Sequence, residues 1–471
     1  MVSKKIMIIA IVVSVILVSV YIESFSKVGL ENVLPGKNNP YVKEYSLPFG
    51  SAPNGLVATK TGLVWVTAQN ATLYSVDSSS GQVEKYLIKN GAVPYENPRV
   101  NSTMVWAIVQ DDIGNIWFSP LGTKTIWRFD PSSHAFASYV SETGAPFQIK
   151  ADKKEVWFTT LRGNTLGVIK PQNGDYAIST FDTGSGTNPA GIFLQNDFTW
   201  IANVGTQNIV KYAINQKDNL TQDITLEQKI PNDNTTLFSS PTDLLVDNNI
   251  LWLTEHGTSF LTSYGITDGK VTRYPTSQNG FDTTTLPFWI RGVDNPKVLW
   301  FNEHQGNKIG RFDVSNKTLI EYAIPSLPKD GYLTYPLNIS QDPRDEKVLW
   351  FSEWNTDKVG VVDGNVPIPF DLDLNVTQMV LSHNKTGAVD LTITGDSYQS
   401  LSLNASSSIT PTAELGNLTV KFSSNISSPP HGLVHLFIDD SKVDPGNYTV
   451  GISASDGFVT KTKFLDLHII P

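Results

Sequence analysis

The 471-residue chain contains no cysteine, which excludes disulfides, thiolate zinc sites and thiol catalysis. Its folded parts must therefore be held together by the burial of apolar side chains. Histidine is also scarce, with 7 residues, and 35 Lys and Arg are outnumbered by 45 Asp and Glu. The formal net charge of -10 argues against a nucleic-acid partner, because a phosphate backbone selects basic surfaces.

Several motifs of common enzyme classes are absent as well. The sequence has no Gly-rich phosphate loop, no Gly-x-Ser-x-Gly and no His-Glu-x-x-His. Nucleotide-dependent, serine-hydrolase and zinc-protease chemistry therefore have no support in the sequence.

Only one strongly hydrophobic run is present, at residues 6–22, directly after Lys4 and Lys5. Such a run reaches the lower limit for a membrane-spanning helix, and the two lysines favour a cytoplasmic N-terminus. We expect residues 1–25 to form a cytoplasmic tip and a single transmembrane anchor in the cell membrane, with the bulk of the chain extracellular. A cleaved signal peptide is the alternative, although no small-x-small cleavage site precedes Glu23.

Acceptor sites for asparagine-linked glycans also indicate export. An Asn-, Ser- and Thr-rich chain forms some Asn-x-Ser/Thr triplets by chance, but a dozen fit a glycosylated surface protein. The candidate asparagines are Asn70, Asn101, Asn219, Asn234, Asn316, Asn338, Asn375, Asn384, Asn404, Asn417, Asn425 and Asn447.

A short apolar run that carries a tryptophan recurs at intervals of 40 to 52 residues. This is the period at which a four-stranded unit recurs in β-propellers. Both faces of such a unit pack against neighbours, which accounts for apolar residues on both sides of each tryptophan. We assign a packing role to these side chains, which are Trp65, Trp117, Trp157, Trp200, Trp252, Trp300 and Trp350.

Each repeat reads as four short strands. It opens near a proline, continues through a first strand, a polar turn and the tryptophan strand, and ends with two strands such as residues 307–313 and 319–325. Gly, Asn and Asp turns separate the strands, so the sequence predicts an all-β fold. The opening prolines are Pro53, Pro98, Pro146, Pro189, Pro241, Pro287 and Pro336.

The last repeat has no fourth strand of its own. A sequence of that type stands instead before the first repeat, at residues 43–48. We predict that residues 43–47 pair with residues 358–362, which would close a seven-bladed propeller over residues 41–363 and remove an open sheet edge. Residues 26–40 would then form a stalk.

After a linker at residues 364–370 the composition changes, because Trp is absent and Ser and Thr are abundant. We predict a small immunoglobulin-like β-sandwich over residues 371–471, in which Asp444 to Tyr448 resembles a tyrosine corner. Fibronectin-type and cadherin-like sandwiches are alternatives. The expected strands are residues 375–381, 389–394, 418–423, 433–438, 447–454 and 459–469.

The clearest repeat, residues 287–325, contains Leu-Trp-Phe-x-Glu, Asn-Lys-Ile-Gly-Arg and Glu-Tyr-x-Ile-Pro. These segments resemble the seven-bladed streptogramin B lyase (virginiamycin B lyase) family, and the resemblance covers residues 43–363. It implies a magnesium-dependent elimination that opens a cyclic depsipeptide antibiotic.

The resemblance also implies where the catalytic side chains would stand. The two histidines and two glutamates of the family correspond here to Phe288, Leu337, Tyr335 and Trp354. None of these can act as the required base or ligate a hard cation in the required way. The resemblance therefore supports the architecture and argues against the lyase reaction.

Three glutamates end the tryptophan strands of the last three repeats: Glu255, Glu303 and Glu353. Antiparallel hairpins place these ends on the same face as the openings of the repeats. One hypothesis is a Mg²⁺ or Ca²⁺ ion held by the three carboxylates, with His256 or His304 as a ligand or general base. We favour the alternative that Glu is a structural feature of the repeat and bonds loop amides.

The same face is expected to display Phe147, Phe288, Trp289, Tyr335 and Trp354. Aromatic rims bind sugars, peptides or proteins. Packing between neighbouring repeats is the alternative that we favour for these side chains.

Together these features predict an extracellular protein that binds or scaffolds at the cell envelope. The expected binding residues are those of the glutamate face: Glu255, His256, Glu303, His304, Glu353, Trp289, Tyr335 and Trp354. The expected partners are the membrane and an envelope protein, glycan or peptide, with no certain cofactor beyond a candidate Mg or Ca ion. A divalent-cation-dependent lyase or hydrolase of diverged specificity is one alternative, and a purely structural envelope component is another.

Overall fold

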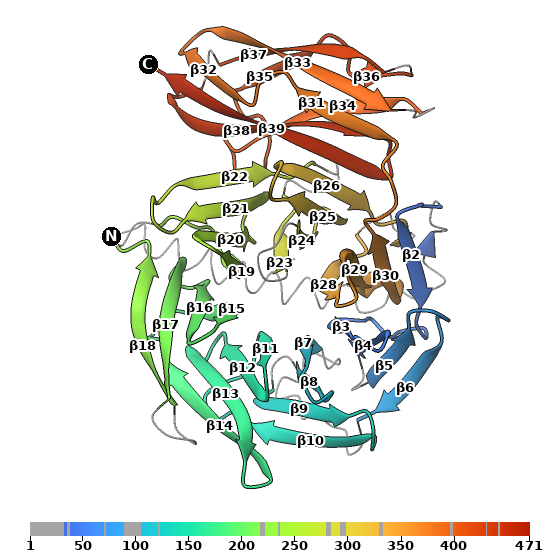
Figure 1. The fold of residues 1–471 in the computed structure, drawn as a ribbon, viewed down its shortest axis with the longest axis vertical. Helices are drawn as coiled ribbons and strands as arrows, with labels where there is room; N and C mark the ends of the chain where they lie inside the picture. The colour runs from blue at the N-terminus through green and yellow to red at the C-terminus, as the bar shows by residue number, and fades with distance from the viewer. Residues whose placement is uncertain are drawn as a thin grey trace.

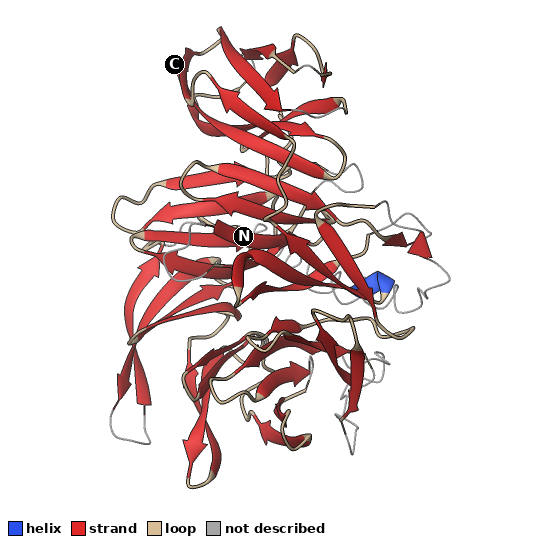
Figure 2. Ribbon diagram, turned by 45° about the vertical axis from the view of Figure 1, so that its right-hand side comes forward, coloured by secondary structure: helices blue, strands red, loops and turns tan. Residues whose placement is uncertain are grey.

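The computed structural model describes residues 33–34, 38–69, 72–88, 105–120, 123–216, 222–233, 236–278, 284–292, 298–328, 333–395, 399–429, 431–440 and 443–471. Strands dominate these ranges, and the helical segment in them is the 3-10 helix η2 (Trp354–Thr356) (Figure 2). None of the helices described is long and apolar enough to cross a membrane. The hydrophobic run at residues 6–22 lies outside the described residues, so the predicted anchor is not tested.

Antiparallel sheets of four strands make up the larger part of the molecule. Between residues 42 and 363, six such sheets stand separately, and four further strands begin a nine-stranded sheet. Their strands are β2 (Val42–Ser46), β3 (Leu56–Ala58), β4 (Leu63–Ala68), β5 (Thr72–Asp77), β6 (Val83–Leu87), β7 (Val105–Gln110), β8 (Ile116–Pro120), β9 (Thr125–Asp130), β10 (Ala135–Val140), β11 (Ile149–Asp152), β12 (Glu155–Thr160), β13 (Thr165–Gln172), β14 (Asp175–Asp182), β15 (Pro189–Gln195), β16 (Phe198–Asn203), β17 (Asn208–Gln216), β18 (Gln222–Ile230), β19 (Pro241–Asp247), β20 (Ile250–Glu255), β21 (Phe260–Gly265), β22 (Val271–Pro275), β23 (Pro287–Arg291), β24 (Val298–Glu303), β25 (Lys308–Asp313), β26 (Thr318–Ala323), β28 (Pro336–Asp342), β29 (Asp345–Glu353) and β30 (Lys358–Asp363).

These four-stranded units, which we call blades, stand around a common centre, as Figure 1 shows. The first strands of the blades contact one another in a closed cycle that runs β3, β7, β11, β15, β19, β23, β28 and back to β3. The tryptophans of the repeat lie in the second strands and are buried. The architecture is therefore a β-propeller, and the tryptophans pack between blades as predicted.

A repeated Phe–Gly pair explains the glycine of the Asn-Lys-Ile-Gly-Arg segment. A Cβ atom on Gly310 would lie 2.3 Å from the Phe301 ring, and one on Gly360 would lie 2.1 Å from the Phe351 ring. Only a residue without a side chain lets the aromatic ring of the second strand lie flat over the third.

The closing blade takes its outer strand from the N-terminal side of the chain. Strand β2 pairs with β30 in an antiparallel register that places Val42 opposite Val362 and Ser46 opposite Lys358. Tyr45 is buried there, with its ring 5.5 Å from that of Trp350. The predicted pairing of residues 43–47 with residues 358–362 is confirmed. Part of the predicted stalk also joins the propeller, because β1 (Val33–Leu34) pairs with β27 (Leu327–Pro328).

The C-terminal residues form two facing sheets, drawn in orange and red above the propeller in Figure 1. One sheet has the order β31-β33-β37-β35, and the other contains β36, β34, β38, β39 and β32. The strands are β31 (Phe370–Leu374), β32 (Gln378–Ser382), β33 (Thr386–Gly395), β34 (Leu401–Ser407), β35 (Thr419–Phe422), β36 (Ile426–Ser427), β37 (Leu433–Asp439), β38 (Gly446–Ser455) and β39 (Val459–Ile470).

The C-terminal part contains the predicted tyrosine hydrogen bond and most of the predicted strands. The Tyr448 hydroxyl donates a hydrogen bond of 2.9 Å to the Asp444 carbonyl, which is the bond of a tyrosine corner. The strands β31 and β34 were not predicted, whereas the other long strands lie within a few residues of their predicted positions.

The two parts of the molecule share one sheet, which the sequence did not reveal. Strand β39 pairs with the outer strand β26, with Thr318 opposite Lys463 and Tyr322 opposite Val459. The buried Phe464 packs against the rings of Tyr274 and Phe312, which lie in two neighbouring blades. The C-terminal part therefore covers an outer blade edge that would otherwise be open to another strand.

Replacing Tyr45 by alanine tests the closing strand. The change removes a buried ring that packs on Trp350, so we expect it to lower the free energy of unfolding by roughly 3 to 5 kcal/mol. Urea unfolding followed by tryptophan fluorescence measures the loss. The matched control is Ser46→Ala, an exposed position in the same strand, and equal stability of the two variants would contradict the predicted role of β2.

Candidate functional site

The blade openings and the ends of the tryptophan strands meet on one face, as predicted. Pro241 stands opposite Glu255, Pro287 opposite Glu303 and Pro336 opposite Glu353. All three glutamates are 0% exposed. Their side chains therefore lie inside the blades and not on the surface of the face.

Glu255 is held by its own blade and by the loop that enters it. Its Oε2 accepts a hydrogen bond of 2.7 Å from the Ser239 amide, and its Oε1 lies 3.0 Å from Arg273 Nε. Arg273 in turn donates to the Leu237 carbonyl at 2.6 Å. Glu255 thus fixes the loop between β18 and β19.

In the next blade a different glutamate, Glu321, binds the amide of the entering loop. The Ser277 amide, in the loop between β22 and β23, donates to Glu321 Oε1 at 2.8 Å. Lys308 Nζ lies 3.7 Å from the same oxygen and donates to the Ser277 carbonyl at 2.8 Å. The carboxyl oxygens of Glu303 are buried and, among the described residues, have no hydrogen-bond partner when Glu303 is ionised.

The closing blade repeats this arrangement with a residue from the N-terminal strand. The Ser326 amide donates to Glu44 Oε1 at 3.0 Å, and Lys358 Nζ donates to Glu44 Oε2 at 2.6 Å. Glu353 accepts a hydrogen bond of 2.7 Å from the Thr356 hydroxyl. We call these three arrangements of carboxylate, basic side chain and entering loop the loop clips.

Of the three strand-end glutamates, Glu255 bonds a loop amide, whereas Glu321 and Glu44 take this role in the other two clips. In the described part of the chain no group of three or more His, Cys, Asp or Glu residues is placed to hold a metal ion. The structure does not bring Glu255, Glu303 and Glu353 together. The favoured interpretation, that Glu bonds loop amides, matches the contact of Glu255 with Ser239 directly.

Burial raises the pKa of Glu303 well above its ordinary value of 4.5, and the neighbouring Glu321 carboxylate raises it further. Burial likewise raises the pKa of Glu353, and Glu44 is the next cause. A neutral carboxylic acid can donate its proton to the adjacent carboxylate, which gives the otherwise unpaired oxygens a partner. We infer that in each of these two clips the two carboxyl groups share a proton beside a lysine.

The two candidate histidines do come together. His256 Nε2 lies 3.3 Å from His304 Nδ1, and His304 is buried while His256 is half-buried. Burial lowers the pKa of His256 to about 4, and burial together with His256 lowers the pKa of His304 well below 6.5. Both imidazoles are neutral at neutral pH, so they are available as bases or as metal ligands.

The expected aromatic rim is mostly interior. Phe147, Phe288, Trp289 and Trp354 are buried, and Tyr335 is half-buried. Trp289 is fully enclosed, and its indole nitrogen donates to the Leu337 carbonyl at 2.8 Å. These rings pack between blades, and together with the buried glutamates they leave little of the predicted contact face exposed.

One group near the centre was missed by the sequence analysis. Asp243 is 0% exposed, accepts a hydrogen bond of 2.8 Å from Gln148 Nε2 and forms an ion pair of 2.6 Å with Arg291. These three side chains come from three different blades: Asp243 and Arg291 lie in first strands, and Gln148 directly precedes the first strand β11. Burial and the nearby Arg291 lower the pKa of Lys150 to about 8. Polar residues in otherwise apolar first strands are the sequence signal for this network.

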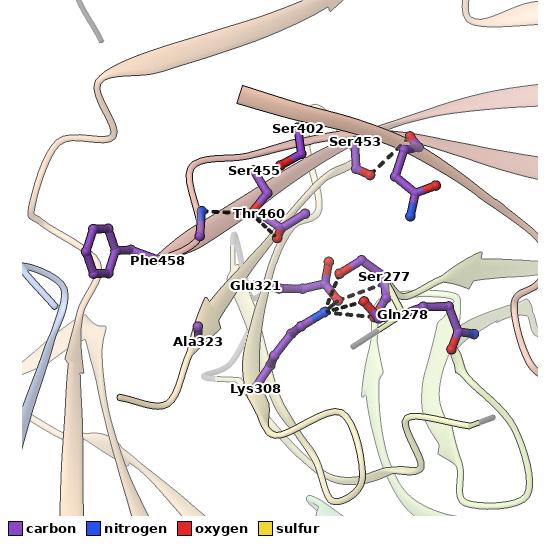
Figure 3. A pocket seen from close by; sticks show the side chains of 12 residues that line it. Ser277, Gln278, Lys308, Glu321, Ala323, Ser402, Ser453, Ser455, Phe458 and Thr460 are labelled. Atoms are coloured by element: carbon purple, nitrogen blue, oxygen red, sulfur yellow. Dashed lines mark hydrogen bonds and ion pairs between the residues drawn. The ribbon is translucent and has the colours of Figure 1, made fainter. Parts of the chain in front are cut away.

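A cavity of about 230 Å³ lies where the outer edges of two blades meet the C-terminal part (Figure 3). Hydroxyl groups from both parts line it, among them Ser277, Ser402, Ser455 and Thr460. Its charged residues are Lys308 and Glu321, which already belong to a loop clip. The cavity is therefore a polar seam between the two parts of the molecule.

Most of the candidate glycosylation sites within the described residues are on the surface. Asn70, Asn101, Asn219 and Asn234 lie outside the described residues. Asn338 is buried, which leaves no room for a glycan in the folded protein. The exposed candidates are Asn316, Asn375, Asn384, Asn404, Asn417, Asn425 and Asn447.

A family model described as the virginiamycin B lyase family matches residues 101–378. The chain belongs to this family. A search of curated proteins finds no match. The virginiamycin B lyase family assignment thus agrees with the resemblance seen in the repeat and with the propeller.

Solved structures resemble this family member in fold only. A 6-phosphogluconolactonase-like protein from Bacteroides uniformis is 14% identical, with a TM-score of 0.45 and coverage of 65% of this chain and 90% of that one. YCF48 from Cyanidioschyzon merolae is 10% identical, with a TM-score of 0.45 and coverage of 68% and 98%.

The lyase positions inferred from the family are occupied by side chains of the wrong chemistry. Phe288, Leu337 and Trp354 are buried, and Tyr335 is half-buried. Magnesium requires oxygen ligands, and none of these residues offers a carboxylate. The residues at these positions therefore do not fit the metal that the family implies.

Replacing Glu303 by glutamine tests the shared proton. Because the folded-state pKa is raised, the stabilisation due to the proton is complete below the unfolded-state pKa near 4.5 and is lost as the pH rises through the folded-state value. We expect Glu303→Gln to exceed the wild type in stability at pH 8, by on the order of 1 kcal/mol, and this gap to close on acidification.

Urea unfolding at a series of pH values measures the gap. The control Glu142→Gln changes an exposed carboxyl and should leave the pH profile of stability unaltered. A Glu303→Gln profile parallel to that of the wild type would show that Glu303 is ionised in the folded protein.

Proposed function

We propose that this chain is a binding or scaffolding protein of the cell envelope that has the lyase-family fold without lyase catalysis. The observation that carries the proposal is the occupation of the inferred catalytic positions by Phe288, Leu337, Tyr335 and Trp354. Aromatic packing replaces the base and the metal ligands, so elimination has no proton acceptor at these positions.

The proposal includes a definite architecture. Residues 41–363 form a seven-bladed propeller that β2 closes, and residues 371–471 form an immunoglobulin-like sandwich after a linker at residues 364–370. Residues 1–25 anchor the protein in the membrane with the bulk outside. The cyclic contacts of the first strands, the tyrosine corner and the seven exposed acceptor asparagines support this arrangement.

The contact surface that we propose lies on the C-terminal part. The outward side chains of β37 include Leu433 and Phe437, which are 56% and 49% exposed. Across the sheet they neighbour Thr392 and Ala388 on one side and, at Phe437, Lys421 on the other. Aromatic side chains are enriched in protein interfaces, and a folded envelope protein is the partner we propose for Leu433 and Phe437.

An assay with a streptogramin B depsipeptide and Mg²⁺ tests the absence of lyase chemistry. We expect the purified full chain to leave the cyclic depsipeptide intact, as followed by mass spectrometry, because no base stands at the catalytic positions. An active lyase of the family is the positive control. Formation of the linear product above the enzyme-free rate would establish the lyase alternative.

Site-specific cross-linking in intact cells tests the binding surface. A photoreactive amino acid in place of Phe437 should give a discrete adduct with one partner protein, which Asp substitution at Leu433 should abolish. The matched control is position 226, where an apolar side chain is 58% exposed on the propeller. Equal adduct patterns from positions 437 and 226 would refute the proposed surface.

A further inference from the structure

The histidine pair is built by two adjacent blades in the same way. His256 and His304 directly follow Glu255 and Glu303, and their amides are fixed to the entering loops. His256 N donates to the Ser240 carbonyl at 3.0 Å, and His304 N donates to the Leu286 carbonyl at 3.1 Å. Two fixed backbones thus direct the imidazoles toward each other.

Phe288 holds both rings in place. Its ring stacks on His304 with a centroid distance of 4.2 Å and an angle of 28°, and it meets His256 edge-on at 4.7 Å. A hydrogen bond to the Leu337 carbonyl raises the pKa of the buried His304, but burial and His256 lower it more. If the proton stands on Nε2, the lone pair is on Nδ1, the nitrogen that faces His256.

The separation of the two nitrogens is informative. At 3.3 Å it exceeds the usual range of about 2.7 to 3.2 Å for a hydrogen bond from an N–H group. Two nitrogens bound to one tetrahedral zinc ion at about 2.0 to 2.1 Å stand roughly 3.3 to 3.4 Å apart. The observed distance therefore matches the spacing of two nitrogens on one metal ion and is long for a direct hydrogen bond.

We propose that His256 Nε2 and His304 Nδ1 together bind a divalent transition-metal ion of the zinc, nickel or copper type. Imidazole nitrogens favour these ions over Mg²⁺ and Ca²⁺, which require oxygen ligands. Water completes the coordination, because the described residues contain no third His, Cys, Asp or Glu in reach. His256 is half-buried, so solvent reaches part of its side chain, whereas His304 is buried.

This site differs from the one that the family resemblance implies. Neither histidine occupies an inferred lyase position, although Phe288, which is one of these positions, contacts both imidazole rings, and Trp354 follows Glu353 as the histidines follow Glu255 and Glu303. The site is also independent of the proposed binding surface, which lies on the C-terminal sheet. Metal binding at the histidines and partner binding at β37 can therefore be tested separately.

Thermal unfolding of the full chain in mild detergent tests the site. Zn²⁺ should raise the melting temperature in a saturable way, by mass action on the folded state, and Mg²⁺ should have no effect. Both His256→Gln and His304→Gln should abolish the zinc-dependent rise. The matched control is His134→Gln, which changes an exposed propeller histidine and should retain the full rise.

A spectroscopic measurement covers the case in which a variant unfolds. Bound Cu²⁺ should show hyperfine coupling to two imidazole nitrogens in its electron paramagnetic resonance spectrum, and His256→Gln should reduce this to one or none. An undiminished zinc effect in both folded histidine variants, or a wild-type spectrum without nitrogen coupling that depends on these residues, would overturn the proposal and leave a direct contact between the histidines.

Discussion

The pairing of β2 with β30 is the interaction on which the rest of the propeller depends. Blades contact only their neighbours, so a ring of blades has an open end unless one blade combines both ends of the repeat region. Glu44, in β2, also belongs to the last loop clip, where it binds the Ser326 amide and Lys358. Closure of the ring therefore also completes one of the three loop clips.

Burial decides what that face can do. A carboxyl group with no access to water either pairs with a basic side chain, as Glu255 does with Arg273, or has a raised pKa that favours its protonated form, as Glu303 has beside Glu321. Phe288 and Trp289 fill the neighbouring space. The face that was expected to bind a metal ion and a partner is thus a packed interior. Within it, the half-buried His256 lies beside His304, and this pair is the part of the candidate set that can still bind a ligand.

Much of the fold was readable from local sequence. The tryptophan period gave the blades, the similarity of residues 43–48 to a fourth strand gave the closing pair, and Asp444 to Tyr448 gave a corner hydrogen bond. The loop clips could be predicted only by comparing the repeats with one another. Arg273 occupies the position that Glu321 and Glu44 occupy in the next two blades, so the carboxylate of the clip does not stay at one place in the repeat. The metal hypothesis placed three glutamates together because strand ends share a face, but sequence carries no information on burial within a blade.

The pairing of β26 with β39 could not be predicted from local sequence, because any outer strand can pair with any free edge. The consequence is visible in the burial of the strand: Leu319, Ile320 and Tyr322 are all buried in β26, whereas the equivalent strand β10 has no buried residue. An outer strand that is apolar on both faces indicates a covering partner. The C-terminal part supplies that partner.

Hydrogen exchange of the full chain, read by mass spectrometry, tests ring closure most directly. If β2 seals the ring, amides of residues 42–46 and 358–362 exchange together and only as fast as the propeller as a whole unfolds. Fast exchange of residues 42–46 while residues 358–362 stay protected would contradict closure by the N-terminal strand.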